Sequence, residues 1–229
     1  MLVLLRFLIL CTLKVVAHIF YACEAKMVGE PIPEPWRGVR MVVLLHHTSL
    51  YEFLYIYALP LSFLWQLARH ATVPAAEETI RRPFVGRLMK AIMPGMIPIT
   101  RKRDESWDRF LDSLSREATV VILPEGRMMR RSGLDKHGQP MTVRGGIADI
   151  LRRLGAGRMV IGYSGGLHHV HAPGDRSPQL FRRLKLNIEV LDIEPYKKQF
   201  PVPEDDLEEF RAAIREDLQR RRDQNRPAL

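Results

Sequence analysis

The sequence predicts an α/β fold, a mixed and largely parallel sheet flanked by helices, with an N-terminal membrane-associated helix in front of it. Residues 41–45, 119–123 and 158–163 are continuous apolar runs of strand length, which is typical of strands buried on both faces of a parallel sheet. Residues 106–116 and 143–154 carry apolar side chains at helical spacing. Strands that alternate with helices predict an α/β layer fold.

The N-terminal 22 residues are almost all apolar and long enough to span or skim a bilayer. On a helical wheel Arg6, Lys14 and His18 fall within an arc of about 120°. Such a stripe favours a helix that lies in the membrane interface or re-enters it, while a full span and a cleaved signal peptide stay as alternatives. We therefore expect a membrane-associated helix over 1–28 and a Pro/Gly linker over 29–38.

The body is expected over residues 39–229 as one domain that ends in a charged helix. Residues 184–190 alternate apolar and polar side chains, which predicts an edge strand or a strand exposed on one side. From Pro203 onward the tail reads as a helix that ends in the cations of 220–222. These cations indicate either a solvated helix end or a patch for lipid headgroups.

Composition narrows the class of protein. The chain has 229 residues, 46% of them hydrophobic and 27% charged, which excludes a disordered chain, collagen and a polytopic membrane protein. The net charge of +9 indicates anionic partners such as phospholipid headgroups or phosphorylated substrates; nucleic acid is not favoured because no reader motif accompanies it. Cys11 and Cys23 cannot build a disulfide framework, which fits a reducing compartment.

A histidine and a carboxylate follow the first strand five residues apart, as His47 and Glu52. A neutral imidazole can act as a general base, and a carboxylate on its other nitrogen holds the tautomer and stabilises the imidazolium. Alternatively, residues 49–52 form a capping box in which Glu52 bonds back to a helix N-terminus. Ser49 is expected as the helix N-cap rather than as a nucleophile.

Two further segments lie where ligands bind in open α/β sheets. Pro124, Glu125 and Gly126 follow the second strand at its carboxyl end, although a plain turn with a solvent-facing Glu is the alternative. The segment 95–101 leads into a run of cations that either binds a phosphate or forms a solvated face. The three histidines at 168, 169 and 171 fit no zinc spacing, so we predict a surface loop and no metal site.

In this order and spacing the three segments resemble the glycerolipid acyltransferase family, the PlsC-like 1-acylglycerol-3-phosphate acyltransferases. His47 matches the catalytic base of the family, and Glu52 matches its aspartate with one more methylene. The family has two further sequence blocks, Gly-x-x-Phe-Ile-x-Arg and Phe-Pro-Glu-Gly-Thr-Arg-Ser. Gly95 and Arg101 match the ends of the second block, and Pro124, Glu125 and Gly126 match the third. The resemblance covers roughly residues 39–163 and implies a glycerolipid-acyltransferase-like α/β domain.

The resemblance implies direct acyl transfer from acyl-CoA or acyl-carrier-protein to the hydroxyl of a lysophospholipid, with no metal or other cofactor. His47 would deprotonate the hydroxyl and Glu52 would orient His47. Arg101, Glu125, Gly126 and Arg127 would position the acceptor. The membrane-associated protein would face the cytoplasm, where thioesters are made, on the inner membrane.

The third block departs from the pattern of the family, because Arg127 stands one position early and the hydroxyl residues are missing. The leading acceptor is 1-acylglycerol-3-phosphate, which would give phosphatidate. Another lyso-lipid, such as lyso-ornithine lipid, is the alternative, as is a catalytically weakened lipid-binding relative.

Overall fold

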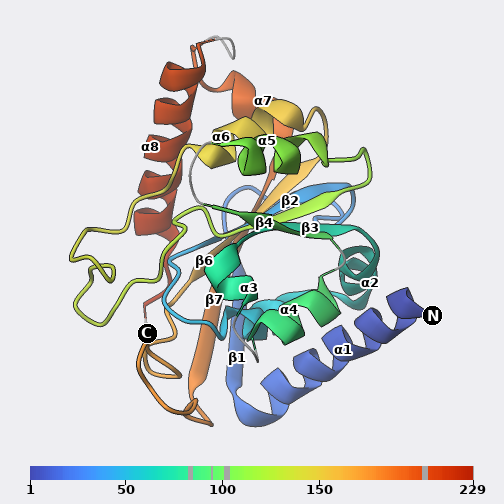
Figure 1. Cartoon of the computed structure of the whole chain (residues 1–229), viewed down its shortest axis with the longest axis vertical. Coiled ribbons are helices and arrows are strands. Elements are labelled where there is room, and N and C mark those ends of the chain that lie inside the picture. Colours follow the sequence, from blue (N-terminus) through green and yellow to red (C-terminus); the bar gives the residue numbers. More distant parts are fainter. Residues whose placement is uncertain (82–84, 94, 101–103, 203–205, 229) are drawn as a thin grey trace.

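A seven-stranded sheet lies at the centre of the described part of the chain (Figure 1). The computed structural model describes residues 1–228 except 82–84, 94, 101–103 and 203–205. The strand order is β1-β7-β6-β2-β5-β3-β4, and each neighbouring pair is parallel except the antiparallel pair of β6 and β7. The strands are β1 (Ala22–Met27), β2 (Val39–Leu45), β3 (Ala71–Ala76), β4 (Gly95–Ile99), β5 (Thr119–Ile122), β6 (Arg158–Ser164) and β7 (Arg183–Asp192). The predicted mixed, largely parallel sheet is confirmed.

Helices cover both faces of the sheet (Figure 1). One face carries α5 (Glu105–Asp112), α6 (Gly146–Arg153), α7 (Ile193–Lys198) and α8 (Leu207–Asn225). On the other face lie α1 (Leu2–Phe20), the 3-10 helix η1 (Glu52–Ala58), α2 (Leu61–His70), α3 (Glu77–Ile80) and α4 (Val85–Ile92). The predicted helices over 106–116 and 143–154 are present as the shorter α5 and α6.

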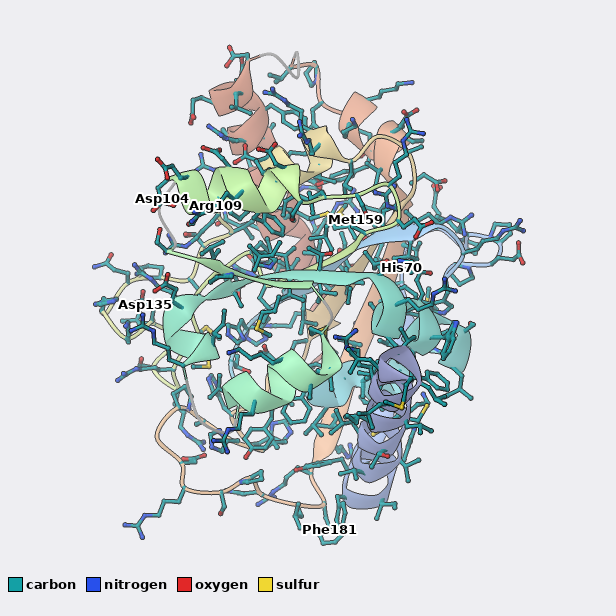
Figure 2. The ribbon with its side chains drawn as sticks, turned by 45° about the vertical axis from the view of Figure 1, so that its right-hand side comes forward. His70, Asp104, Arg109, Asp135, Met159 and Phe181 are labelled. Atoms are coloured by element: carbon teal, nitrogen blue, oxygen red, sulfur yellow. The ribbon has the colours of Figure 1, made fainter. Side chains whose placement is uncertain are left out.

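The apolar runs of the sequence become the inner strands because their side chains are buried on both faces. In β2, Met41 and Val43 pack with Ile147 on the side of α6, whereas Val42 and Leu44 pack into the cluster on the side of α1. Parallel strands end at one edge, so β2, β5 and β6 bring the segments that follow them together. In Figure 2, Asp104 and Asp135, which follow β4 and β5, lie on one side of the molecule, and His70, which precedes β3, lies on the other.

One expected boundary and one expected strand position differ in the structure. The N-terminal helix does not continue to residue 28, because it ends at Phe20 and residues 22–27 form β1. Strand β1 pairs in parallel with β7, so β7 is an inner strand and the edge alternative is wrong. The other alternative fits, because buried and half-buried side chains alternate along residues 184–188. The sequence of β1, Ala-Cys-Glu-Ala-Lys-Met, lacks apolar alternation. Its backbone pairing with β7, which no local pattern encodes, therefore decides its structure.

Two residues of the basic stripe of α1, Lys14 and His18, contact the protein. The Lys14 ammonium donates to the backbone carbonyls of Tyr57 and Leu59 at the end of η1, the latter at 2.9 Å. His18 packs edge-to-face on the ring of Tyr57, with centroids 5.9 Å apart. The exposed face is mostly apolar, and includes Leu2, Leu4, Leu5, Leu8, Val15 and Ile19. By length and composition α1 could cross a membrane, and it is the one such helix among the described residues.

Candidate active site

His47 and Glu52 meet at the carboxyl end of β2. One Glu52 carboxylate oxygen bonds Nδ1 of His47, and the other accepts from the backbone N–H of Thr48 at 2.6 Å and of Ser49 at 3.3 Å. The Glu52 side chain is only 5% exposed. An ionised carboxylate only accepts hydrogen bonds, so Nδ1 carries the proton and the basic lone pair lies on Nε2. One side chain therefore holds the His47 ring and also accepts from the two backbone N–H groups that follow His47. These N–H groups lie before the helix rather than at its N-terminus, since η1 begins only at Glu52.

The expected N-cap role of Ser49 is wrong. Helix η1 begins at Glu52, after Tyr51, and no side chain caps it. The Ser49 hydroxyl instead accepts from the backbone N–H of Tyr51 at 3.2 Å, inside the turn before the helix. At the first position of the helix, the Glu52 carboxylate bonds back to His47 and Thr48.

Glu125 lies beneath the histidine segment and is 2% exposed, so the alternative of a solvent-facing Glu is wrong. Its two oxygens accept from two consecutive backbone N–H groups, of His46 at 3.2 Å and of His47 at 2.6 Å. Arg222 of α8 donates to the same carboxylate at 3.0 Å. The carboxylate is thus engaged with the backbone that carries His47.

His46 has a left-handed backbone, with φ of 67°, directly before the candidate base. Its ring is fixed on both sides: Nδ1 donates to the Ser164 carbonyl at 2.9 Å, and Nε2 lies 3.4 Å from the Arg226 guanidinium. Burial lowers the pKa of His46 below its ordinary value of 6.5; the Arg226 charge lowers it further, and the Ser164 carbonyl opposes the shift. A neutral ring fits both contacts, since one nitrogen donates and the other accepts.

Of the expected acceptor-binding residues, Gly126 and Arg127 line the same cavity as His47 and Glu52. Gly126 has a φ of 65° in the turn that follows Glu125. The Arg127 guanidinium forms an ion pair with Asp135, whose side chain is 2% exposed. Arg101 lies outside the described residues.

The cavity has a volume of about 790 Å³. Besides His47 and Glu52, its lining is mostly apolar and reaches Leu10 and Leu13 of α1. Arg127, Arg144 and Arg215 add cations to the lining. A cavity with a base, a long apolar wall and cationic groups suits an amphiphilic substrate that carries an acyl chain and an anionic group. No cluster of three or more His, Cys, Asp or Glu that could hold a metal occurs in the described ranges.

Several residues that organise the site escape sequence reasoning. Ser164 holds the His46 ring through its carbonyl, and the Thr48 hydroxyl accepts from the backbone N–H of Leu167 at 2.7 Å. Arg222 and Arg226 come from the tail, where a solvated end or a headgroup patch was expected. Arg222 is instead only 15% exposed and paired with a buried carboxylate. The run of arginines at 220–222 is the one signal for it, and only the tertiary structure shows where it points.

Comparison with known proteins places this arrangement in context. A sequence model of the family described as Acyltransferase matches residues 25–163, more than half of the chain. Among solved structures, the chain is similar to the 1-acyl-sn-glycerophosphate (LPA) acyltransferase PlsC from Thermotoga maritima, with 16% identity and a TM-score of 0.54. The match covers 94% of this chain and 80% of the PlsC chain, and at this identity it shows a similar fold alone. No sequence among the curated proteins matches.

Proposed function

Because the chain belongs to the acyltransferase family, we propose that it moves a fatty acyl chain from a thioester donor to the hydroxyl of a lysophospholipid. The observation that carries the proposal is the His47–Glu52 pair in the wall of a large, mostly apolar cavity. A base held by a carboxylate supplies the proton transfer that acyl transfer needs. The apolar wall supplies room for acyl chains.

In the proposed mechanism, Nε2 of His47 takes the proton of the acceptor hydroxyl as its oxygen attacks the thioester carbonyl carbon. Glu52 holds the Nδ1 proton and stabilises the imidazolium that forms. The tetrahedral intermediate collapses, the carbon–sulfur bond breaks, and the leaving thiolate takes the proton from His47. The products are an ester and a free thiol, with no acyl-enzyme and no protein nucleophile.

We propose 1-acylglycerol-3-phosphate as the acceptor, which gives phosphatidate, and acyl-CoA or acyl-carrier-protein as the donor. The arginines in the cavity wall support an anionic headgroup, since guanidinium groups suit phosphate. One observation favours a second candidate, a lyso-aminolipid such as lyso-ornithine lipid. The ion pair with Asp135 already offsets the charge of Arg127, so Arg127 should bind a phosphomonoester less strongly.

We further propose that the protein sits on the cytoplasmic face of the membrane with α1 lying in the interface. The outward face of α1 is apolar, and Leu61 and Trp65 of the neighbouring α2 are also exposed. Because Lys14 ties α1 to η1, the helix stays against the body rather than crossing the bilayer away from it. Leu10 and Leu13 link this helix to the cavity, which would give lipid chains a short path to His47.

The test is acceptor-dependent thiol release by the purified full-length protein in lipid vesicles, with acyl-CoA and acyl-carrier-protein as donors and a panel of lysolipids. Wild type is compared with His47→Ala and Glu52→Gln. The matched control is His70→Ala, because His70 lies at the opposite edge of the sheet (Figure 2). We expect release with one acceptor class, a loss of at least about a hundredfold in the two site variants, and little change in the control.

The panel also distinguishes the two acceptors. Release with 1-acylglycerol-3-phosphate together with phosphatidate as the product supports the first candidate, and release with lyso-ornithine lipid alone supports the second. Release by wild type that never exceeds that of His47→Ala with any acceptor would overturn the proposed function.

A further inference from the structure

The helix α8 lies outside residues 25–163, which the acyltransferase family model matches, yet it contacts the candidate active site. Arg222, in its last turn, reaches Glu125, which is 97 positions earlier in the sequence. In Figure 1 the lower end of α8 lies beside the edge of the sheet where the strands β2 and β6 end. The contact therefore joins a C-terminal element to the segment that carries the base.

Arg222 faces a carboxylate that has little access to water. Its guanidinium donates to the Glu125 carboxylate at 3.0 Å and to the Met141 carbonyl at 3.1 Å. The Glu125 side chain is 1% exposed. A carboxylate buried to this degree needs a counter-charge or hydrogen-bond donors, since desolvation of an unpaired charge costs several kcal/mol. Arg222 provides that counter-charge.

The other donors to Glu125 are the backbone N–H groups of His46 and His47. Two consecutive N–H groups beside a left-handed residue form a concave nest for an anion. Here the anion is the Glu125 carboxylate, so the peptide between His46 and His47 is held in place by hydrogen bonds to Glu125. The position of the His47 ring depends on that peptide, because the peptide ends at the Cα atom of His47, which carries the side chain.

Helix α8 is rigidly placed, which gives Arg222 a fixed origin. Its residues Phe210, Ile214 and Leu218 are fully buried in the core beside α6. One residue before Arg222, Arg221 bridges Glu189 of β7 and Asp217 of α8, each at 2.7 Å. The packing and this buried bridge fix the helix without involving Glu125, so the separate role of Arg222 can be tested.

We propose that Arg222 is a positioning residue for acyl transfer. From α8 it keeps the Glu125 carboxylate aimed at the N–H groups of His46 and His47 and thereby sets the place of the base. This inference rests on the proposed function. A base displaced by about 1 Å can lose about a hundredfold in rate while substrate binding is little changed, so the effect belongs in kcat rather than in KM.

The first experiment compares Arg222→Met and Arg222→Lys with Arg220→Met in the full-length protein. Arg220 lies on the same helix and pairs with Asp217, so its replacement removes a cation without touching Glu125. We expect Arg222→Met to lower kcat about a hundredfold and Arg222→Lys about tenfold, with KM for both substrates within about twofold. Arg220→Met should stay within about twofold of wild type. Arg222→Lys keeps the charge and serves as the folded variant if Arg222→Met does not fold.

A double-substitution cycle with Glu125→Gln separates positioning from a general structural role. If Arg222 acts through the Glu125 charge, adding Arg222→Lys to Glu125→Gln should lower kcat by no more than about twofold further. Hydrogen exchange supplies a readout besides activity: the His46 and His47 amides should exchange faster in the Arg222 variants and be unchanged in Arg220→Met.

Two results would overturn the inference. One is a kcat of a folded Arg222 variant equal to that of Arg220→Met, with unchanged exchange at His46 and His47. The other is an undiminished effect of Arg222→Lys in the Glu125→Gln background. A failure of the proposed function looks different, because wild type would then equal His47→Ala, while the amide exchange would still report whether Arg222 holds this peptide.

Discussion

Glu52 holds His47 twice, through the imidazole ring and through the chain that follows it. One carboxylate oxygen bonds Nδ1 of the ring, and the other accepts from the backbone N–H groups of Thr48 and Ser49. The ring orientation and the loop conformation therefore depend on the same group.

Replacement of the Glu52 carboxylate should stop catalysis. Glu52→Gln keeps the size of the side chain but loses the charge that stabilises the imidazolium, so we expect kcat to fall by about 10² to 10⁴. Glu52→Asp keeps the charge with poorer reach, and about a tenfold loss is expected. Steady-state thiol release measures both. A Glu52→Gln variant as active as wild type would remove the carboxylate from the mechanism.

His46 should make the stability of the protein depend on pH. Its pKa in the folded state is lowered from 6.5 by burial, so between the folded value and 6.5 the unfolded chain binds more protons. The free energy of unfolding contributed by the neutral ring is thus fully present above pH 6.5 and is lost as the pH falls through the lowered pKa.

His46→Asn is the matched variant, since asparagine tolerates a positive φ and does not titrate. We expect its unfolding midpoint to fall less than that of wild type when the pH is lowered from about 8 to about 5. Urea unfolding at a series of pH values checks this. Equal pH dependence in the two proteins would assign the effect to other groups.

Gly126→Ala should damage both stability and turnover. Its φ of 65° is strained for an L residue, at a cost of about 1 kcal/mol, and the added Cβ would lie 3.2 Å from Nε of Arg144. Gly138→Ala is the control, because Gly138 has a φ of 74° with nothing within 4 Å of the new Cβ. Both variants should lose about 1 kcal/mol in urea unfolding, but only Gly126→Ala should also lose kcat. Full activity of Gly126→Ala would mean that the turn absorbs the methyl group.

The exposed leucines of α1 should carry membrane binding. Leu4 and Leu8 are each 52% exposed, and burial of a leucine side chain contributes about 1.5 kcal/mol or more. A protein with both Leu4→Gln and Leu8→Gln should bind vesicles about a hundredfold more weakly in a co-sedimentation assay. Undiminished binding would show that another surface meets the lipid.

Lys14→Met should act on stability instead. The Lys14 ammonium bonds the carbonyls of Tyr57 and Leu59 at the end of η1 and is turned away from the exposed face of α1. The loss of these bonds leaves carbonyls unsatisfied at a cost of about 1 to 3 kcal/mol, so the melting temperature should fall by several degrees. Binding of the variant to anionic vesicles should stay within about twofold of wild type. A large loss of vesicle binding would show that Lys14 contacts the lipid.

Much of the fold follows from local pattern. The apolar runs at 41–45, 119–123 and 158–163 have one stable environment, the inside of a sheet covered on both faces, and they are β2, β5 and β6. The sequence also places both His47 and Glu125 directly after such strands, and in the structure the backbone N–H of His47 donates to Glu125. Strand β1 could not be predicted, since its short polar sequence is ordered by pairing with β7.

The sequence by itself determined the chemistry of the site: a histidine five residues before a carboxylate, at a strand end, in an order that matches one enzyme family. Only the tertiary structure decided how that chemistry is held. It turned Glu125 from a group expected to contact the acceptor into one that binds the backbone of His46 and His47, and it brought in Arg222 from α8. The physical reason is that spacing along the chain encodes local hydrogen bonds, whereas a buried carboxylate takes its partners from whichever elements the packing of the core brings within reach.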